Sequence, residues 1–216
     1  MERIFYENRE LRFLSPQDST AFLPKGHYTY NYLNLADLIE VVHTHFLTSP
    51  NGSVWDITFS NPKQTQQTFS DFIHDFEIIK AAGGLVHAIN PNTKEINYLY
   101  IYRYKMWDLP KGKREKKEEN RETALREVIE ETGISNLQLG RALPTTYHFI
   151  KGKGCFSVKE SSWFEMEAVY DSFLKPQLEE GIEKAVWLNQ KEIFQYREAM
   201  FASISYLTAC YFSEFG

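Results

Sequence analysis

Three glutamates share one side of a helix predicted near the middle of the chain. Within the segment from Asn120 to Thr132, Glu127 and Glu131 are four residues apart, and Glu130 follows Glu127 by three. In a helix this spacing brings the three carboxylates to one edge. Dense carboxylate oxygens suit hard divalent cations, and Mg²⁺ is commonly held by a few carboxylates, water and substrate phosphates. The sequence therefore indicates a site for Mg²⁺, or Mn²⁺, that acts on a phosphorylated substrate.

Charges around this helix fit the same chemistry. Arg126 precedes Glu130 by four residues and could also reach Glu118, which would orient a carboxylate and balance charge. The loop before the helix is basic and could hold polyphosphate oxygens through Lys111, Lys113, Arg114, Lys116 and Lys117. Charge patterning alone also fits a solvated helix with ion pairs and a loop made soluble by its charges.

The full spacing of the segment points to one family. From Gly112 it runs glycine, five residues, Glu118, seven residues, and then Arg-Glu, two apolar residues, Glu-Glu, one residue, Gly133 and an apolar residue. This resembles the complete box of the Nudix hydrolases. The resemblance extends over about residues 76 to 200: Ala82 to Val86 is similar to the first strand of that fold, Trp107 to Gly112 to the approach to the box, and Trp187 to a late strand.

The resemblance implies an α/β fold in which a mixed β-sheet is sandwiched between α-helices. By position, Glu127 and Glu131 would be the principal metal ligands, with Glu130 as a third ligand or as the group that orients the attacking water. The Gly112 carbonyl would be a further ligand, and Glu118 and Arg126 would support the catalytic carboxylates.

The implied reaction is hydrolysis of a phosphoanhydride in a nucleoside diphosphate linked to another moiety, without a covalent enzyme intermediate. A phosphoanhydride already has a good leaving group, so its cleavage needs charge neutralisation, alignment and an activated water. Divalent ions on clustered carboxylates supply all three. This agrees with the chemistry indicated by the residues themselves.

Two groups outside the box are candidates for further roles. In this family the general base is often a glutamate in a separate loop, and Glu179, Glu180 and Glu183 precede Trp187; of these we select Glu180. All three could equally be solvated loop charges. His148 could line the substrate site, or it could pack against its aromatic neighbours in a strand.

The attached group of the substrate is indicated by fewer residues. The segment Trp-Asp-Leu-Pro-Lys-Gly, from Trp107 to Gly112, looks like enzymes that act on dinucleoside polyphosphates or diphosphoinositol polyphosphates, whereas ADP-sugar hydrolases more often have Pro-Gly-Gly. Alternatives are a nucleoside triphosphate pyrophosphohydrolase, an ADP-sugar hydrolase, a diphosphate isomerase and a non-catalytic Nudix-like nucleotide sensor. The intact carboxylate set argues against the sensor.

The chain is expected to have two parts. Residues 1–75 form a small α+β N-terminal extension of unassigned role, and residues 76–216 form the Nudix domain with a C-terminal helix. In the extension we expect strands at Arg3–Phe5, Leu11–Leu14 and Val54–Phe59, and helices at Leu35–Phe46 and Thr65–Asp75. His43 and His45 are two residues apart, so a helix would point them in different directions, and neither they nor His74 indicate a metal site.

The second part alternates strands with two helices. We expect strands at Phe76–Ala81, Leu85–Ile89, Glu95–Arg103, Leu137–Leu139, Thr145–Ile150, Ser162–Tyr170 and Lys184–Leu188. One helix spans Asn120–Thr132, and a final helix runs from Gln190 to Phe212. The final helix is uncharged from Ala199 to Ser213, so it must be buried, either against the N-terminal extension or in a homodimer interface.

Composition limits the remaining classes of function. The chain has 216 residues, 43% hydrophobic, and a net charge of −5, which predicts a globular protein and disfavours general binding to duplex nucleic acid. Cys155 and Cys210 lie in no metal or redox motif. The N-terminus does not resemble a signal peptide, and the longest uncharged stretch is too short to span a membrane. We expect a cytoplasmic monomer or homodimer that acts on a small molecule.

Overall fold

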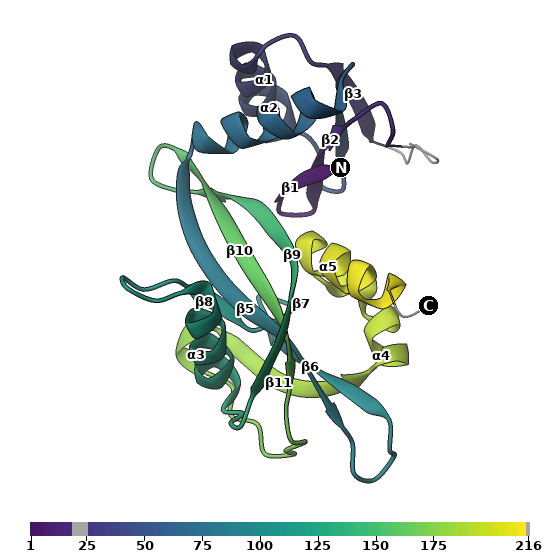
Figure 1. Ribbon diagram of the computed structural model, residues 1–216, viewed down its shortest axis with the longest axis vertical. Helices are drawn as coiled ribbons and strands as arrows, with labels where there is room; N and C mark the ends of the chain where they lie inside the picture. The colour runs from purple at the N-terminus through teal and green to yellow at the C-terminus, as the bar shows by residue number, and fades with distance from the viewer. Residues whose placement is uncertain (19–25, 215–216) are drawn as a thin grey trace. The chain divides into compact units, whose positions relative to one another are not determined.

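The computed structural model describes residues 1–18 and 26–214, which form two compact units (Figure 1). The first unit comprises residues 1–79 and 147–159, and the second comprises residues 80–146 and 160–216. Three long strands contribute residues to both units: β5 (Glu77–Ile89), β9 (Gln138–Lys151) and β10 (Phe156–Glu167). The ends of β9 and β10 therefore belong with the N-terminal residues, which the sequence did not indicate.

The first unit is a small α+β structure. Its strands are β1 (Glu2–Tyr6), β2 (Arg9–Leu14), β3 (His27–Asn31) and β4 (Val54–Thr58), and its helices are α1 (Leu35–Val41), the π-helical turn η1 (Val42–Phe46) and α2 (Pro62–His74). The strand order is β9-β1-β2-β4-β3, with β1 and β2 antiparallel and the other pairs parallel. The elements expected from the sequence are confirmed, and β3 was missed because this strand at the end of the sheet has few apolar residues.

The core of the first unit lies between its sheet and its helices. Leu38, Phe46 and Phe72 are fully buried on the helices, and Leu11 and Phe13 are fully buried on β2. The alternation of apolar residues in the strands and their helical spacing in α1 and α2 thus place them on one shared surface. His43 and His45 are both exposed, and the His43 ring lies 5.8 Å from the ring of Phe76.

The second unit is a sheet with helices on both faces (Figure 1). Its remaining strands are β6 (Ile96–Arg103), β7 (Met106–Asp108), β8 (Lys111–Lys113) and β11 (Ile182–Asn189). Its helices are α3 (Asn120–Thr132), the 3-10 turn η2 (Leu178–Glu180), α4 (Gln190–Gln195), the 3-10 turn η3 (Arg197–Ala199) and α5 (Ala202–Ser213). The strands run in the order β11-β6-β5-β10-β9, with β7 paired to β6 and β8 paired to β5.

Each face of this sheet has its own core. Val86 and Leu99 pack with Val128 of α3, whereas Leu85 and Tyr100 pack with Leu207 of α5. The chain as a whole contains both parallel and antiparallel strand pairs. The expected mixed sheet between helices is therefore confirmed.

Two strands that were expected to be broken are continuous. β5 runs through Gly83 and Gly84, and β9 runs from Gln138 to Lys151 without the predicted interruption. Gly83 is in register with Lys111 of β8, and a Cβ atom there would overlap the Pro110 carbonyl. The glycine thus allows a close approach of two backbones and does not mark a turn.

The single final helix predicted from the sequence is wrong, because the chain is extended between α4 and α5. Met200 has φ −100° and ψ 152°, and it forms a bridge with Trp107. The Phe201 amide also donates to the Trp107 carbonyl at 3.3 Å. The expected burial of this segment is confirmed, but Met200, Ile204, Leu207 and Tyr211 are covered by the core of the second unit, which is not one of the two partners expected from the sequence. No helix within the described residues is long and apolar enough to span a membrane.

The hydroxyl of Tyr100 provides a test of how α5 is held on the sheet. Tyr100 is fully buried, and its hydroxyl lies 2.9 Å from the hydroxyl of Thr208. Tyr100→Phe leaves the Thr208 hydroxyl buried without this partner, so we expect the free energy of unfolding to fall by about 1–3 kcal/mol. Urea unfolding followed by tryptophan fluorescence measures the change. The partly exposed Tyr196→Phe is the control, and an equal loss in both variants would contradict the assignment.

Candidate active site

Helix α3 places the three glutamates as the sequence predicts. Glu119 and Glu122 form a capping box at its N-terminus, and Gly133 ends it with φ 72°. Ala124 and Val128 of α3 pack against the sheet. Carboxylates on the side of the helix next to these two residues are therefore buried, and those further round the helix are exposed. Glu127 is 6% exposed and Glu131 is fully buried, whereas the side chain of Glu130 is 47% exposed.

Glu127 packs directly against the backbone of the box loop. Gly112 lies in β8, in register with Ala82 of β5, and a Cβ atom at Gly112 would overlap the Glu127 carboxylate. A larger residue at Gly112 would therefore displace this carboxylate. Burial raises the pKa of Glu127, the Arg126 charge lowers it, and nearby acids including Glu180 raise it.

Glu131 is held by two donors from neighbouring strands. The Lys111 backbone amide donates to its Oε2 atom at 2.7 Å, and Arg103 Nη1 donates to its Oε1 atom at 3.2 Å. Burial raises the pKa of Glu131 to about 7, although Arg103 and Lys111 act in the opposite direction. A further positive charge beside this carboxylate would therefore stabilise its ionised form.

Asp108 completes a buried network of four charged side chains: Arg103, Asp108, Lys111 and Glu131. Asp108 is 1% exposed and accepts from Arg103 Nε at 3.0 Å, from Arg103 Nη2 at 2.8 Å and from Lys111 Nζ at 2.5 Å. Burial alone would raise the pKa of Asp108, but the charges of Lys111 and Arg103 lower it to about 2. Two cations thus compensate two buried carboxylates.

This network includes residues that the sequence did not single out. Arg103 and Asp108 carry no box position, and only their charge within otherwise apolar strands could have drawn attention to them. Lys111 was predicted to bind phosphate. The structure places its ammonium on Asp108 and 5.7 Å from the centre of the Trp163 ring, with 7% of the residue exposed.

Arg126 forms hydrogen bonds with three carboxylates, those of Glu118, Glu127 and Glu130. Its Nε atom donates to Glu118 Oε1 at 2.6 Å and its Nη2 atom to Glu118 Oε2 at 2.9 Å, so the contact expected between these residues is present. Its Nη1 atom donates to Glu127 at 2.7 Å and to Glu130 at 2.9 Å. The hydrogen bond from Arg126 is the main cause that lowers the pKa of Glu118 to about 2.

The basic loop between β8 and α3 lies next to these carboxylates in the chain. Lys113, Lys116 and Lys117 are exposed, and Arg114 is half-buried with its Nη1 atom 3.3 Å from the Asn120 side-chain oxygen. Lys113 is adjacent to Gly112, and its carbonyl accepts from Arg126 Nη2 at 3.2 Å. Exposed cations are thus available close to the carboxylates for phosphate oxygens.

The loop before β11 is attached to the end of α3. The Lys175 amide donates to the Thr132 carbonyl at 2.8 Å, and the Gln177 amide donates to the Glu131 carbonyl at 3.2 Å. Glu180 then lies exposed in η2, close enough for its charge to act on Glu127. Glu179 and Glu183 are also exposed. His148 belongs to the first unit, in register with Phe5 of β1, and not to the unit that holds the carboxylates.

The residue types of this site fit a divalent cation. Glu127 and Glu131 provide hard oxygen atoms in a buried place, where burial raises the pKa of both, and the Gly112 backbone lies against the Glu127 carboxylate. As the side chains lie, Arg126 bridges Glu127 and Glu130. Among residues 1–18 and 26–214, no three His, Cys, Asp or Glu side chains are already arranged around a metal position.

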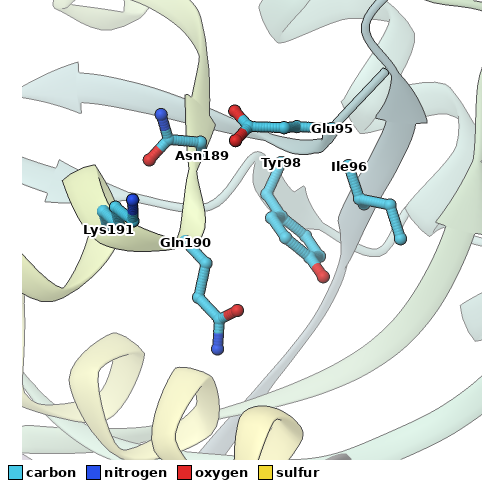
Figure 2. A pocket seen from close by; sticks show the side chains of 6 residues that line it. All are labelled: Glu95, Ile96, Tyr98, Asn189, Gln190 and Lys191. Carbon is cyan, nitrogen blue, oxygen red and sulfur yellow. The ribbon is translucent and has the colours of Figure 1, made fainter. Parts of the chain in front are cut away.

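A pocket of about 320 Å³ lies at the opposite end of β6 from Arg103 (Figure 2). It is lined by Glu95, Ile96, Tyr98, Asn189, Gln190 and Lys191. These residues come from the end of the β5–β6 hairpin and from the start of α4, and none of them belongs to the box. The pocket is therefore separate from the carboxylate site.

Comparison with known proteins finds a family match and similar solved structures. A family model described as NUDIX domain matches residues 82–208. The chain is similar to the NUDIX domain of NrtR from Shewanella oneidensis, complexed with ADP ribose, with 12% identity over 68% of this chain and 98% of that chain and a TM-score of 0.50. At this identity the similarity shows a shared fold.

Two further solved structures have similar values. An Ap4A hydrolase from C. elegans, in a binary complex, shows 20% identity over 63% of this chain and 96% of that chain, with a TM-score of 0.48. A MutT protein from Methanosarcina mazei Go1 shows 20% identity over 65% of this chain and 96% of that chain, with a TM-score of 0.49.

Substitution of Asp108 tests how much the buried network contributes to stability. Asp108→Asn removes the charge that compensates Arg103 and Lys111, so we expect the free energy of unfolding at neutral pH to fall by about 3–5 kcal/mol. Denaturant unfolding measures the loss, and Glu95→Gln, at an exposed position in the β5–β6 turn, is the control.

The pH dependence of the same variant follows from the lowered pKa. The pKa of Asp108 falls from 3.8 to about 2 on folding. The contribution of its charge to the free energy of unfolding is therefore present above pH 3.8 and is lost as the pH falls towards 2. The difference between wild type and Asp108→Asn should therefore shrink over that interval. A difference that stays constant down to pH 2 would contradict the assignment.

Proposed function

The chain belongs to the NUDIX domain family, and we propose that it is a metal-dependent hydrolase that cleaves a phosphoanhydride bond in a nucleoside diphosphate linked to another moiety. The observation that carries this proposal is the packing of the Glu127 carboxylate on the Gly112 backbone, beside the buried Glu131. Glu130 is exposed on the same helix edge. This combination supports binding of a cation between helix and loop, open to a phosphorylated substrate.

Each residue of the site has a role in this proposal. Glu127, Glu131, Glu130 and the Gly112 carbonyl would hold Mg²⁺, or Mn²⁺, which when bound neutralises phosphate charge and lowers the pKa of a bound water. Arg103 and the Lys111 amide fix the orientation of Glu131.

The outer residues complete the proposed mechanism. Arg126 fixes Glu118, Glu127 and Glu130. Glu180 would accept the proton of the attacking water, since it is the loop glutamate whose charge is felt at Glu127.

Phosphate oxygens of the substrate would be held by the basic loop. Lys113 and Arg114 are the available cations nearest to Gly112, whereas the ammonium of Lys111 is engaged by Asp108. For the attached group we favour dinucleoside polyphosphate or diphosphoinositol-like substrates. A nucleoside triphosphate pyrophosphohydrolase and an ADP-sugar hydrolase are the alternative activities. We place this small-molecule activity in the cytoplasm, in a monomer or homodimer that binds neither duplex nucleic acid nor membrane.

A nucleotide sensor without turnover is the second candidate. It is favoured by Arg126, which bridges Glu127 and Glu130 and would have to yield one of them to a cation. Turnover separates the two candidates. The purified protein is therefore assayed with Mg²⁺ against nucleoside triphosphates, dinucleoside polyphosphates, ADP-ribose and diphosphoinositol polyphosphates, and release of phosphate, pyrophosphate and nucleotides is measured.

Substitution of the inner carboxylates tests the catalytic role. We expect Glu127→Gln and Glu131→Gln each to reduce turnover by at least about 100-fold, because each would remove a charged metal ligand. Chelation of Mg²⁺ should abolish the same activity. Glu167→Gln, at an exposed position of β10, is the control. Circular dichroism and unfolding curves establish that the variants are folded, and full activity in chelator would rule out the proposed hydrolysis.

Glu180 is tested against its neighbour in the same loop. We expect Glu180→Gln to lower kcat by about 10²- to 10⁴-fold with little change in KM, since a general base acts in the chemical step. Glu183→Gln, which changes an exposed glutamate three residues later, should retain nearly full activity. Steady-state kinetics on the best substrate measures both. Equal activity of the two variants would remove Glu180 from the mechanism.

A further inference from the structure

Tyr104 occupies a turn that favours other residues. It joins β6 to β7 together with Lys105, and both have positive φ, 51° for Tyr104 and 62° for Lys105. Asparagine, aspartate or glycine is the usual choice at such positions, because a larger side chain is strained there. Strained residues are held in place by their surroundings and gather at ligand-binding sites. The strained backbone of Tyr104 thus makes this residue a candidate for ligand binding.

The Tyr104 ring lies beside the loop that carries Glu180. A Cβ atom built on Gly181 would be 3.6 Å from the ring, and Gly181, with φ 73°, directly follows Glu180. In the chain, Tyr104 directly follows Arg103, whose guanidinium binds Glu131. The ring therefore lies next to the residue that follows Glu180, and its backbone adjoins the arginine that binds Glu131.

Despite these neighbours, most of the ring faces solvent. Tyr104 is 70% exposed, and Leu178 in the adjoining turn is 69% exposed. Single apolar side chains on a surface need no explanation. Tyr104, however, combines an exposed aromatic ring with a strained backbone, and it adjoins Arg103, which binds the proposed metal ligand Glu131. An exposed aromatic ring of this kind can stack on a planar ligand group.

We propose that Tyr104 stacks on the base of a nucleotide substrate and selects substrates that carry a nucleoside. This inference rests on the proposed function, since it assigns the group attached to the phosphates cleaved at the same site. Every base presents a flat face, so an exposed tyrosine binds it with little preference among bases. A diphosphoinositol substrate has no aromatic group and gains nothing from this ring.

Binding of ADP and of inorganic tripolyphosphate, both with Mg²⁺, tests the inference. Stacking on one base is worth roughly 1–3 kcal/mol, which corresponds to an affinity change on the order of 5- to 150-fold. We expect Tyr104→Asn and Tyr104→Ala to lose ADP affinity by this factor in calorimetric titrations, while their affinity for tripolyphosphate stays within about twofold. Tyr104→Trp should retain ADP binding. Phe194→Ala, another exposed aromatic residue of the second unit, is the control.

The asparagine variant separates binding from folding. Asparagine tolerates positive φ, so Tyr104→Asn should be at least as stable as wild type while it binds ADP weakly. An unchanged ADP affinity, an equal loss for tripolyphosphate, or an equal loss for a diphosphoinositol polyphosphate would overturn the inference. If wild type binds ADP through Tyr104 but hydrolyses nothing, the proposed hydrolysis fails and the inference stands. If wild type hydrolyses nucleotides and Tyr104→Asn binds ADP normally, only the inference fails.

Discussion

The buried network of Arg103, Asp108, Lys111 and Glu131 is the interaction on which the candidate site depends. Burial of one carboxylate without a partner costs several kcal/mol, so Glu131 can be fully buried only because cations accompany it. Arg103 comes from β6, Asp108 from β7, Lys111 from β8 and Glu131 from α3. One set of charges thus fixes three strands and the helix relative to each other, and the backbone amide of Lys111 adds a direct hydrogen bond between β8 and α3.

A second arginine carries out the complementary task at the surface. Arg126 binds Glu118, Glu127 and Glu130 at once, so it orients the buried Glu127 together with two more exposed carboxylates. Its contacts with three carboxylates also explain why α3 tolerates acids at such short spacing, since uncompensated carboxylates would repel one another. The Glu127 carboxylate contacts both the Arg126 guanidinium and the Gly112 backbone. In the proposed mechanism, a bound cation would replace part of the compensation that Arg126 now supplies.

Local signals made α3 and its carboxylates predictable, whereas pairings between distant segments were not. The helix bounds match because the start and the glycine stop are encoded within a few residues of the helix. Asp108 and Arg103 were missed because their roles arise only when β6, β7 and α3 come together. The same reason explains the break before α5, where pairing of Met200 with Trp107 overrides an apolar helical pattern. Lys111 was correctly placed beside the carboxylates by its position, but sequence could not show that Asp108 engages its ammonium.

The strands β9 and β10 show why a boundary near residue 75 does not describe the two units. The NUDIX family match runs through residues 147–159, yet these residues complete the core of the first unit. Phe149 is 2% exposed, and its ring lies 6.2 Å from Phe72 and 5.0 Å from Phe76, while Ile4 of β1 is in register with Tyr147. Removal of the N-terminal residues would expose Phe149 and leave the β9 edge unpaired, which favours aggregation. We therefore expect the N-terminal residues to be needed to cover strands that the family domain itself supplies, whatever further role they have.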